Sequence, residues 1–78
     1  MSEFKTTMRA LTLYENEPRK GISLDEATWN AIDYLSKRER KKWSDWALEQ
    51  LSKYPEAINR TAVLRYEAMK QIFDVAVK

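Results

Sequence analysis

Apolar and polar residues alternate in two short stretches near the start of the chain and then recur with a helical period. Residues Thr7–Tyr14 mix β-branched and aromatic side chains in partial alternation, and apolar residues occupy every other position near the end of Arg19–Leu24. Between them, residues 15–18 carry asparagine and proline, which break regular structure. We therefore predict β segments within residues 7–24, preceded by a disordered start at residues 1–6.

A helical period begins immediately after the second β segment. Asp25 is a competent N-cap, because its side chain can accept a hydrogen bond from the first turn of a helix. Apolar residues then recur at i, i+3, i+4 and i+7, which predicts a first helix that ends near Arg38. A second helix covers about Trp43–Lys53 and ends before Pro55, because proline disfavours helix in the residue before it. Residues 25–53 therefore read as two helices with a short joint between them.

The last part of the chain, residues 59–76, predicts a third helix with Asn59 or Thr61 as its cap. This helix carries two apolar stripes rather than one. A helix that is apolar on two sides is buried between two neighbours, which suggests a dimer. The stripes are Ala62, Tyr66, Met69, Phe73 and Ala76 on one side, and Leu64, Ala68, Ile72 and Val75 on the other.

The fold class predicted for residues 1–78 is one mainly α domain with a short N-terminal β segment. A short strand cannot stand alone, because its backbone N–H and C=O groups need partners. The most economical partner is the same strand of another copy, so we expect a homodimer. A chain of 78 residues without cysteine is also marginal as a monomer.

Composition removes several function classes. The chain has neither histidine nor cysteine, which excludes the usual zinc sites and most nucleophile–base pairs. We therefore expect no enzyme, no metal and no cofactor. The N-terminus has no apolar core of signal-peptide length and no segment approaches a membrane span, so a cytoplasmic location is expected. The three tryptophans lie at helical spacings typical of a core rather than of base stacking.

The basic residues are unevenly placed although the formal net charge is only +2. Half of the 14 basic residues lie in Arg19–Lys20 and in the run Lys37–Lys42, which joins the first two helices. In a two-fold dimer both patches are doubled. A local basic face of this kind binds phosphates in spite of a mild overall charge.

The segment Gly21–Leu51 resembles the ribbon-helix-helix DNA-binding proteins of the Arc and MetJ type. The features that carry the resemblance are the Ile22-x-Leu24 strand, its acidic continuation, the Trp29-x-x-Ile32-x-x-Leu35 pattern and a turn near Arg40. Arg9–Leu13 and Asn59–Tyr66 are similar to the extra first strand and the third helix of one bacterial subfamily. The resemblance implies an intertwined homodimer that represses transcription and reads double-stranded DNA with a β-ribbon in the major groove.

The resemblance also implies a role for particular residues. Outward-facing strand residues would contact bases, the start of the second helix would hold a phosphate, and apolar residues would form the dimer core. The base-contact positions are Arg19, Gly21 and Ser23; the phosphate positions are Arg40, Lys41, Lys42 and Trp43; the dimer core is Ile22, Leu24, Ile32, Leu35, Trp46, Ala47 and Leu51.

The chain departs from the family pattern at several of these positions. Arg40 stands at the turn where the family has glycine, so a left-handed backbone there would cost about 1 kcal/mol. Lys42 replaces the usual serine or threonine cap, and Gly21 has no side chain with which to read a base. Lys20 occupies the inward phase of its strand, where an apolar residue is expected.

Two alternatives stay open. Met8–Leu13 is the other candidate for the ribbon, and Arg9 would then be the outward residue that reads bases. The chain would otherwise be a dimeric protein-binding module, such as an antitoxin that holds a toxin or a phage-encoded inhibitor of a host protein.

Overall fold

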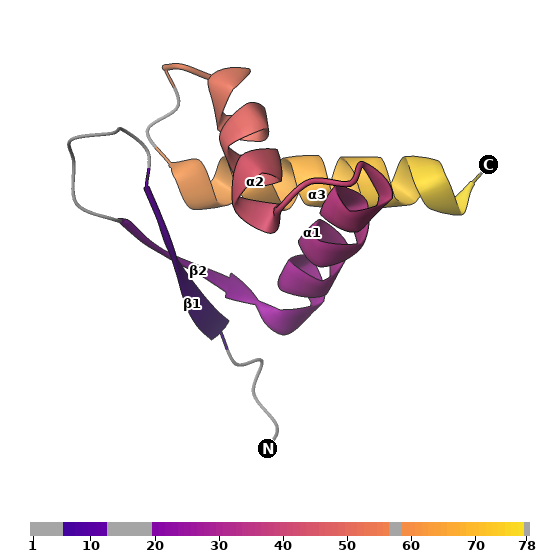
Figure 1. Ribbon diagram of the computed structural model, residues 1–78, viewed down its shortest axis with the longest axis horizontal. Coiled ribbons are helices and arrows are strands. Elements are labelled where there is room, and N and C mark those ends of the chain that lie inside the picture. The colour runs from indigo at the N-terminus through magenta and orange to yellow at the C-terminus, as the bar shows by residue number, and fades with distance from the viewer. Residues whose placement is uncertain (1–5, 13–19, 57–58, 78) are drawn as a thin grey trace.

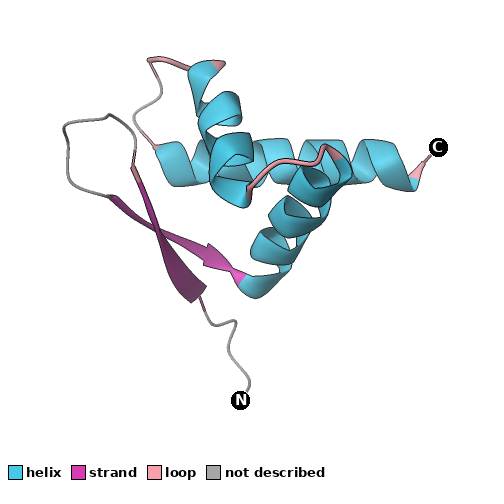
Figure 2. Cartoon of the chain, viewed as in Figure 1, coloured by secondary structure: helices cyan, strands magenta, loops and turns pink. Residues whose placement is uncertain are grey.

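The computed structural model describes residues 6–12, 20–56 and 59–77, which form a β-hairpin followed by three helices (Figures 1 and 2). The elements are β1 (Thr6–Leu11), β2 (Lys20–Asp25), α1 (Glu26–Arg38), α2 (Trp43–Ser52) and α3 (Arg60–Ala76). The chain is mostly helical with a short antiparallel sheet, as the pattern predicts. The predicted disordered start overlaps β1 at Thr6 and otherwise lies outside the described residues, as does the breaker segment 15–18.

The two strands pair with each other in antiparallel register, with Arg9 opposite Ile22 and Ala10 opposite Gly21. One edge of β2 thus has a partner within the same chain, and the expected pairing of β2 with β2 of another copy stays a prediction. The reason for the pairing with β1 is loop closure: β1 lies only a short connection away on the same chain, and closing a short loop costs little entropy. Leu11, Ile22 and Leu24 are buried on the inner face of the hairpin.

The three helices begin at residues suited to cap them, with one exception. The Asp25 carboxylate accepts a hydrogen bond from the Thr28 backbone N–H (3.1 Å) and another from the Thr28 hydroxyl (2.6 Å). These bonds, led by the one from the hydroxyl, hold the pKa of Asp25 below its usual value. Asn59, rather than Thr61, caps α3 by accepting from the Ala62 N–H (3.0 Å). The exception is α2, whose N-cap residue Lys42 makes no side-chain capping bond.

The core lies between the hairpin and the three helices, and α3 contacts both α1 and α2 (Figure 1). It includes Trp29 and Trp46, which agrees with the interpretation of the tryptophans as core residues. The residues predicted for the dimer core are buried within this one chain, except Leu51, which is half-buried. Their burial therefore does not require a second copy. On α3, the stripe that contains Leu64 and Ala68 faces the core.

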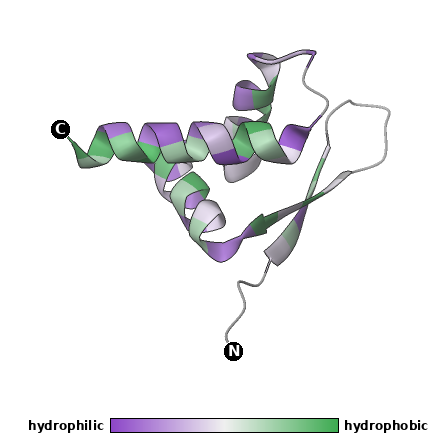
Figure 3. Ribbon diagram, turned by 180° about the vertical axis from the view of Figure 1, so that it is seen from behind, coloured by the Kyte–Doolittle hydropathy of each residue, from purple (hydrophilic) through white to green (hydrophobic). Residues whose placement is uncertain are grey.

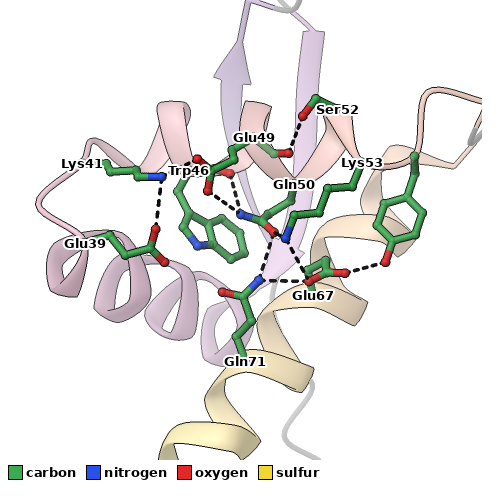
Figure 4. Close-up of polar contacts among 10 residues, drawn as sticks. Glu39, Lys41, Trp46, Glu49, Gln50, Ser52, Lys53, Glu67 and Gln71 are labelled. Atoms are coloured by element: carbon green, nitrogen blue, oxygen red, sulfur yellow. Dashed lines mark hydrogen bonds and ion pairs between the residues drawn. The ribbon is translucent and has the colours of Figure 1, made fainter.

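A polar network centred on the buried side chains of Gln50 and Glu67 joins α2 to α3 (Figure 4). Gln71 donates to both Gln50 Oε1 (3.0 Å) and Glu67 Oε1 (2.9 Å), and the Tyr54 hydroxyl donates to Glu67 Oε2 (2.5 Å). Lys53 donates to Gln50 Oε1 (2.9 Å) and lies 3.9 Å from Glu67. Glu67 is only 3% exposed, so its charge is stable there because these donors replace water.

The same network shifts two pKa values. Burial alone would raise the pKa of Glu67, but hydrogen bonds from Tyr54 and Gln71 and the charges of Lys53 and Lys70 lower it below its usual value. The hydrogen bond to Glu67, helped by burial, raises the pKa of Tyr54 to about 12. Tyr54 thus stays a donor throughout the range in which Glu67 titrates.

The lowered pKa of Glu67 predicts an acid-dependent loss of stability. Its contribution is complete above the ordinary value of 4.5 and disappears as the pH falls through the lower folded-state pKa. We expect Glu67→Gln to be less stable than the natural chain at pH 7, by about 1 kcal/mol, and the difference to shrink in acid. Urea unfolding at several pH values measures this difference in the free energy of unfolding, and Glu56→Gln, at an exposed glutamate, is the control. A difference that does not change with pH would contradict the assignment.

Candidate nucleic-acid interface

The described residues on the outer face of the hairpin are uncharged. Gly21 and Ser23 are exposed on β2, in the phase opposite to Ile22 and Leu24, as the alternation predicts. Met8 of β1 is 68% exposed and lies over Gly21, where an added Cβ would come 2.5 Å from the Met8 sulfur. The third predicted base contact, Arg19, lies outside the described residues. Two of the three predicted base-contact positions therefore face outward.

Arg9 does not face outward, so the expectation that it is an outward residue of β1 is wrong, whereas the choice of Met8–Leu13 as the ribbon strand stays a prediction. Its guanidinium donates two hydrogen bonds to the Asp33 carboxylate of α1 (2.8 and 2.9 Å). It also lies 4.4 Å from the Trp29 ring centroid and 5.1 Å from that of Trp43. Strand alternation explains the error, because Arg9 shares the phase of Leu11, which is buried.

The two tryptophans beside Arg9 complete a cluster that docks the hairpin on the helices. Trp29 and Trp43 meet edge to face with their centroids 5.3 Å apart, and the Trp29 indole N–H donates to the Thr7 carbonyl oxygen (2.6 Å). Such contacts combine aromatic burial with cation–π attraction. The Asp33 pair raises the pKa of Arg9, so its positive charge persists at every accessible pH. This cluster sets the position of the hairpin relative to the start of α2.

The joint between α1 and α2 is a left-handed turn at Arg40, whose φ is 58°. The Lys41 N–H donates to the Ser36 carbonyl (2.9 Å) and the Arg40 N–H donates to the Lys37 carbonyl (3.0 Å), which is the Schellman pattern of helix ends. The left-handed arginine anticipated from the sequence is therefore present. A side chain at this backbone conformation costs about 1 kcal/mol relative to glycine.

Cationic side chains surround this turn. Lys37, Arg38, Arg40 and Lys42 are exposed, and we call these four residues the basic joint. Lys41, predicted to hold a phosphate, is instead engaged with Glu49 (2.5 Å) and Glu39 (3.1 Å) (Figure 4). These two carboxylates raise the pKa of Lys41, and they neutralise much of its field.

The first turn of α2 follows the basic joint and lies near the end of β1. Trp43 is half-buried and its ring lies against Arg9, so the part of Trp43 that could contact a phosphate is its backbone N–H. The first N–H groups of a helix lack intrahelical partners, and here no side chain in the described part of the chain caps them. A hollow of about 260 Å³ adjoins this turn, lined by Thr12 and Ser44 among others. Asp45 in the same turn already supplies one negative charge.

Sequence reasoning missed the roles of Asp33 and Glu49. Asp33 binds Arg9 across the cluster, and Glu49 binds Lys41 from the next turn of α2. Only the strand phase of Arg9 could have indicated the first pair, because 24 residues separate its partners. The second pair depends on how the turn at Arg40 orients Lys41 relative to α2, and no pattern in the neighbouring sequence indicates that orientation.

The comparisons with known proteins found no match to a protein-family model, to a curated protein or to a solved structure. Within the described residues, no helix is both long enough and apolar enough to cross a membrane. The same residues bring no group of three potential metal ligands together.

Proposed function

We propose that this chain is a DNA-binding protein of the ribbon-helix-helix type that acts as a homodimer on a two-fold related site. The order of β2, α1 and α2, with a tight turn between the helices, supports the proposal. The observation that carries it is the basic joint: its four exposed cations come directly before α2 in the chain, and the N-cap residue of α2 makes no side-chain capping bond. Positive charge and free N–H groups at one place favour a phosphate.

In this proposal, β2 pairs through its second edge with β2 of another copy. Within the described chain, β2 has a strand neighbour on one edge alone. The intertwined ribbon would then have four strands, with both copies of Ser23 on its outer face. Arg19 and Ser23 would supply the side chains that read the bases, whereas Gly21 lies beneath the Met8 side chain and supplies none.

The two parts of the interface have different tasks. Phosphate contacts from the basic joint and the start of α2 position the dimer and supply salt-dependent affinity. Base contacts from the ribbon supply sequence preference. The dimer would repress its own operon or a neighbouring one by occupying the site, without chemistry and without a cofactor.

A fluorescence-anisotropy titration tests the proposal, using the duplex that lies upstream of this gene and a scrambled duplex of equal length. We expect the native duplex to bind at least about 100-fold more tightly at 0.15 M salt, and both affinities to fall as salt rises. Absence of binding to either duplex at 0.05 M salt would overturn the proposal.

One observation favours a second candidate function, a protein-binding module such as an antitoxin. The outer face of the hairpin has no cation at Thr6, Met8, Ala10, Gly21 or Ser23, so its described residues offer little to a base edge. Capture of a stable protein partner by this chain, together with no duplex binding at low salt, would establish that alternative.

A further inference from the structure

The outer face of α3 is apolar, and no element of the described chain covers it. Tyr66, Met69 and Phe73 are 56%, 62% and 65% exposed. Ala62 and Ala76 continue the same line in both directions and are also exposed. Figure 3 views the molecule from behind, with α3 in front of the other helices. We call Ala62, Tyr66, Met69, Phe73 and Ala76 the α3 seam.

The spacing within the α3 seam points to another helix as its occupant. The five residues follow one another at intervals of four, three, four and three. This is the a/d repeat with which two helices pack knobs into holes. A strand or a flat surface would not require that interval, and a row of large apolar side chains on a monomer marks an interaction site.

The residue sizes in the seam favour a second copy in antiparallel orientation. Pairing the a positions with the d positions of the partner places Tyr66 opposite Ala76 and Met69 opposite Phe73, so that each large side chain of the seam has a partner and only Ala62 lies beyond the paired layers. A parallel pair would instead stack alanine on alanine and phenylalanine on phenylalanine, and would bring Lys70 beside Arg65 of the other copy.

The charges beside the seam are also self-complementary in that orientation. Lys70 and Asp74 are both exposed and lie on the same side of the seam, one helical turn apart. In a two-fold antiparallel pair, Lys70 of each copy lies within about one turn of Asp74 of the other. The same pairing brings the two copies of Lys70 near each other at the two-fold axis, and the two Asp74 carboxylates on either side of them offset that repulsion.

We propose that α3 is a self-association surface on which two copies of this chain pair as antiparallel helices along the α3 seam. This interface is separate from the β2 edge and independent of DNA. A chain that pairs at both places joins dimers to one another, and where the symmetry closes it forms a tetramer, which would hold two ribbons at adjacent sites on one duplex.

Sedimentation velocity on the free full-length protein tests this interface. Phe73→Glu, at a side chain 65% exposed, is expected to halve the mass of the assembly and to weaken self-association at least tenfold. Tyr34→Glu on α1, also an exposed aromatic, is the matched control and should leave the mass unchanged. Far-ultraviolet circular dichroism verifies that each variant is folded. An assembly mass that Phe73→Glu leaves unchanged would overturn the proposal, as would a natural chain that stays monomeric at 0.5 mM, and the seam would then belong to a different protein.

Charge exchange tests the orientation. Lys70→Asp and Asp74→Lys should each weaken self-association, whereas the double variant should restore it. The two single variants, mixed, should pair with each other, since one then carries only acidic and the other only basic residues at these positions. Native mass spectrometry distinguishes the mixed pair by mass, and failure of both rescues would overturn the antiparallel pairing. Duplex binding that persists in Phe73→Glu separates this inference from the proposed function.

Discussion

Replacing Arg40 and Lys42 together by glutamine is expected to weaken duplex binding by about 100-fold or more at 0.1 M salt. Both side chains are exposed and flank the turn that precedes α2. A dimer loses four cations in this variant, and each phosphate contact contributes roughly 0.9 to the slope of log affinity against log salt. The slope should therefore decrease by up to about 3.6, and affinity for native and scrambled duplexes should decrease alike.

The matched control for this variant removes the same charge elsewhere. Arg60→Gln with Arg65→Gln also subtracts two positive charges per chain, at exposed positions on α3. If the basic joint is the phosphate site, the control should lose far less affinity than the joint variant. Equal losses in both variants would mean that net charge alone drives binding, and the assignment of the joint would be wrong.

Arg40→Gly separates stability from binding at the same position. Glycine adopts a φ of 58° without the steric cost that arginine bears, so the free energy of unfolding should rise by about 1 kcal/mol. Duplex affinity should nevertheless fall, since a cation is lost. A variant that is more stable and binds as tightly as the natural chain would exclude Arg40 from the interface.

The second large effect concerns the Arg9 cluster. Arg9→Ala is expected to lower the free energy of unfolding by about 2–3 kcal/mol, because it removes a bidentate pair with Asp33 and cation–π contacts with two tryptophans. The Asp33 side chain is 47% exposed, so solvent screening reduces the contribution of the Arg9–Asp33 ion pair to the free energy of unfolding. Urea unfolding followed by tryptophan fluorescence measures the free energy of unfolding. Arg9→Lys keeps the charge but not the planar guanidinium, so its stability should lie between those of the natural chain and Arg9→Ala.

The same variant distinguishes docking from base reading. Because Arg9 points to the helices, the ratio of native to scrambled duplex affinity should survive in Arg9→Ala under conditions where the variant is folded. Full stability combined with a lost sequence preference would show that Arg9 faces the DNA after all.

Local physical chemistry explains why the helices were predictable. Asp25 and Asn59 cap the helices that follow them, and the bounds of α1 and α3 lie within a residue or two of those predicted. The inward phase of Ile22 and Leu24 follows from strand alternation alone, whereas the left-handed turn at Arg40 was indicated by the family resemblance, which places glycine at that position. The caps and the strand phase depend on neighbours a few residues away, which the sequence displays directly.

Tertiary structure alone decided which groups meet across longer separations. The sequence by itself determined three helices, a β segment and a cationic joint. Only the fold decided that β2 pairs with β1, that Arg9 turns inward to Asp33, that Lys41 is neutralised by Glu49, and that one stripe of α3 stays uncovered. The physical reason is that periodicity tells which residues share a face, whereas the partner of that face depends on competing contacts between distant segments.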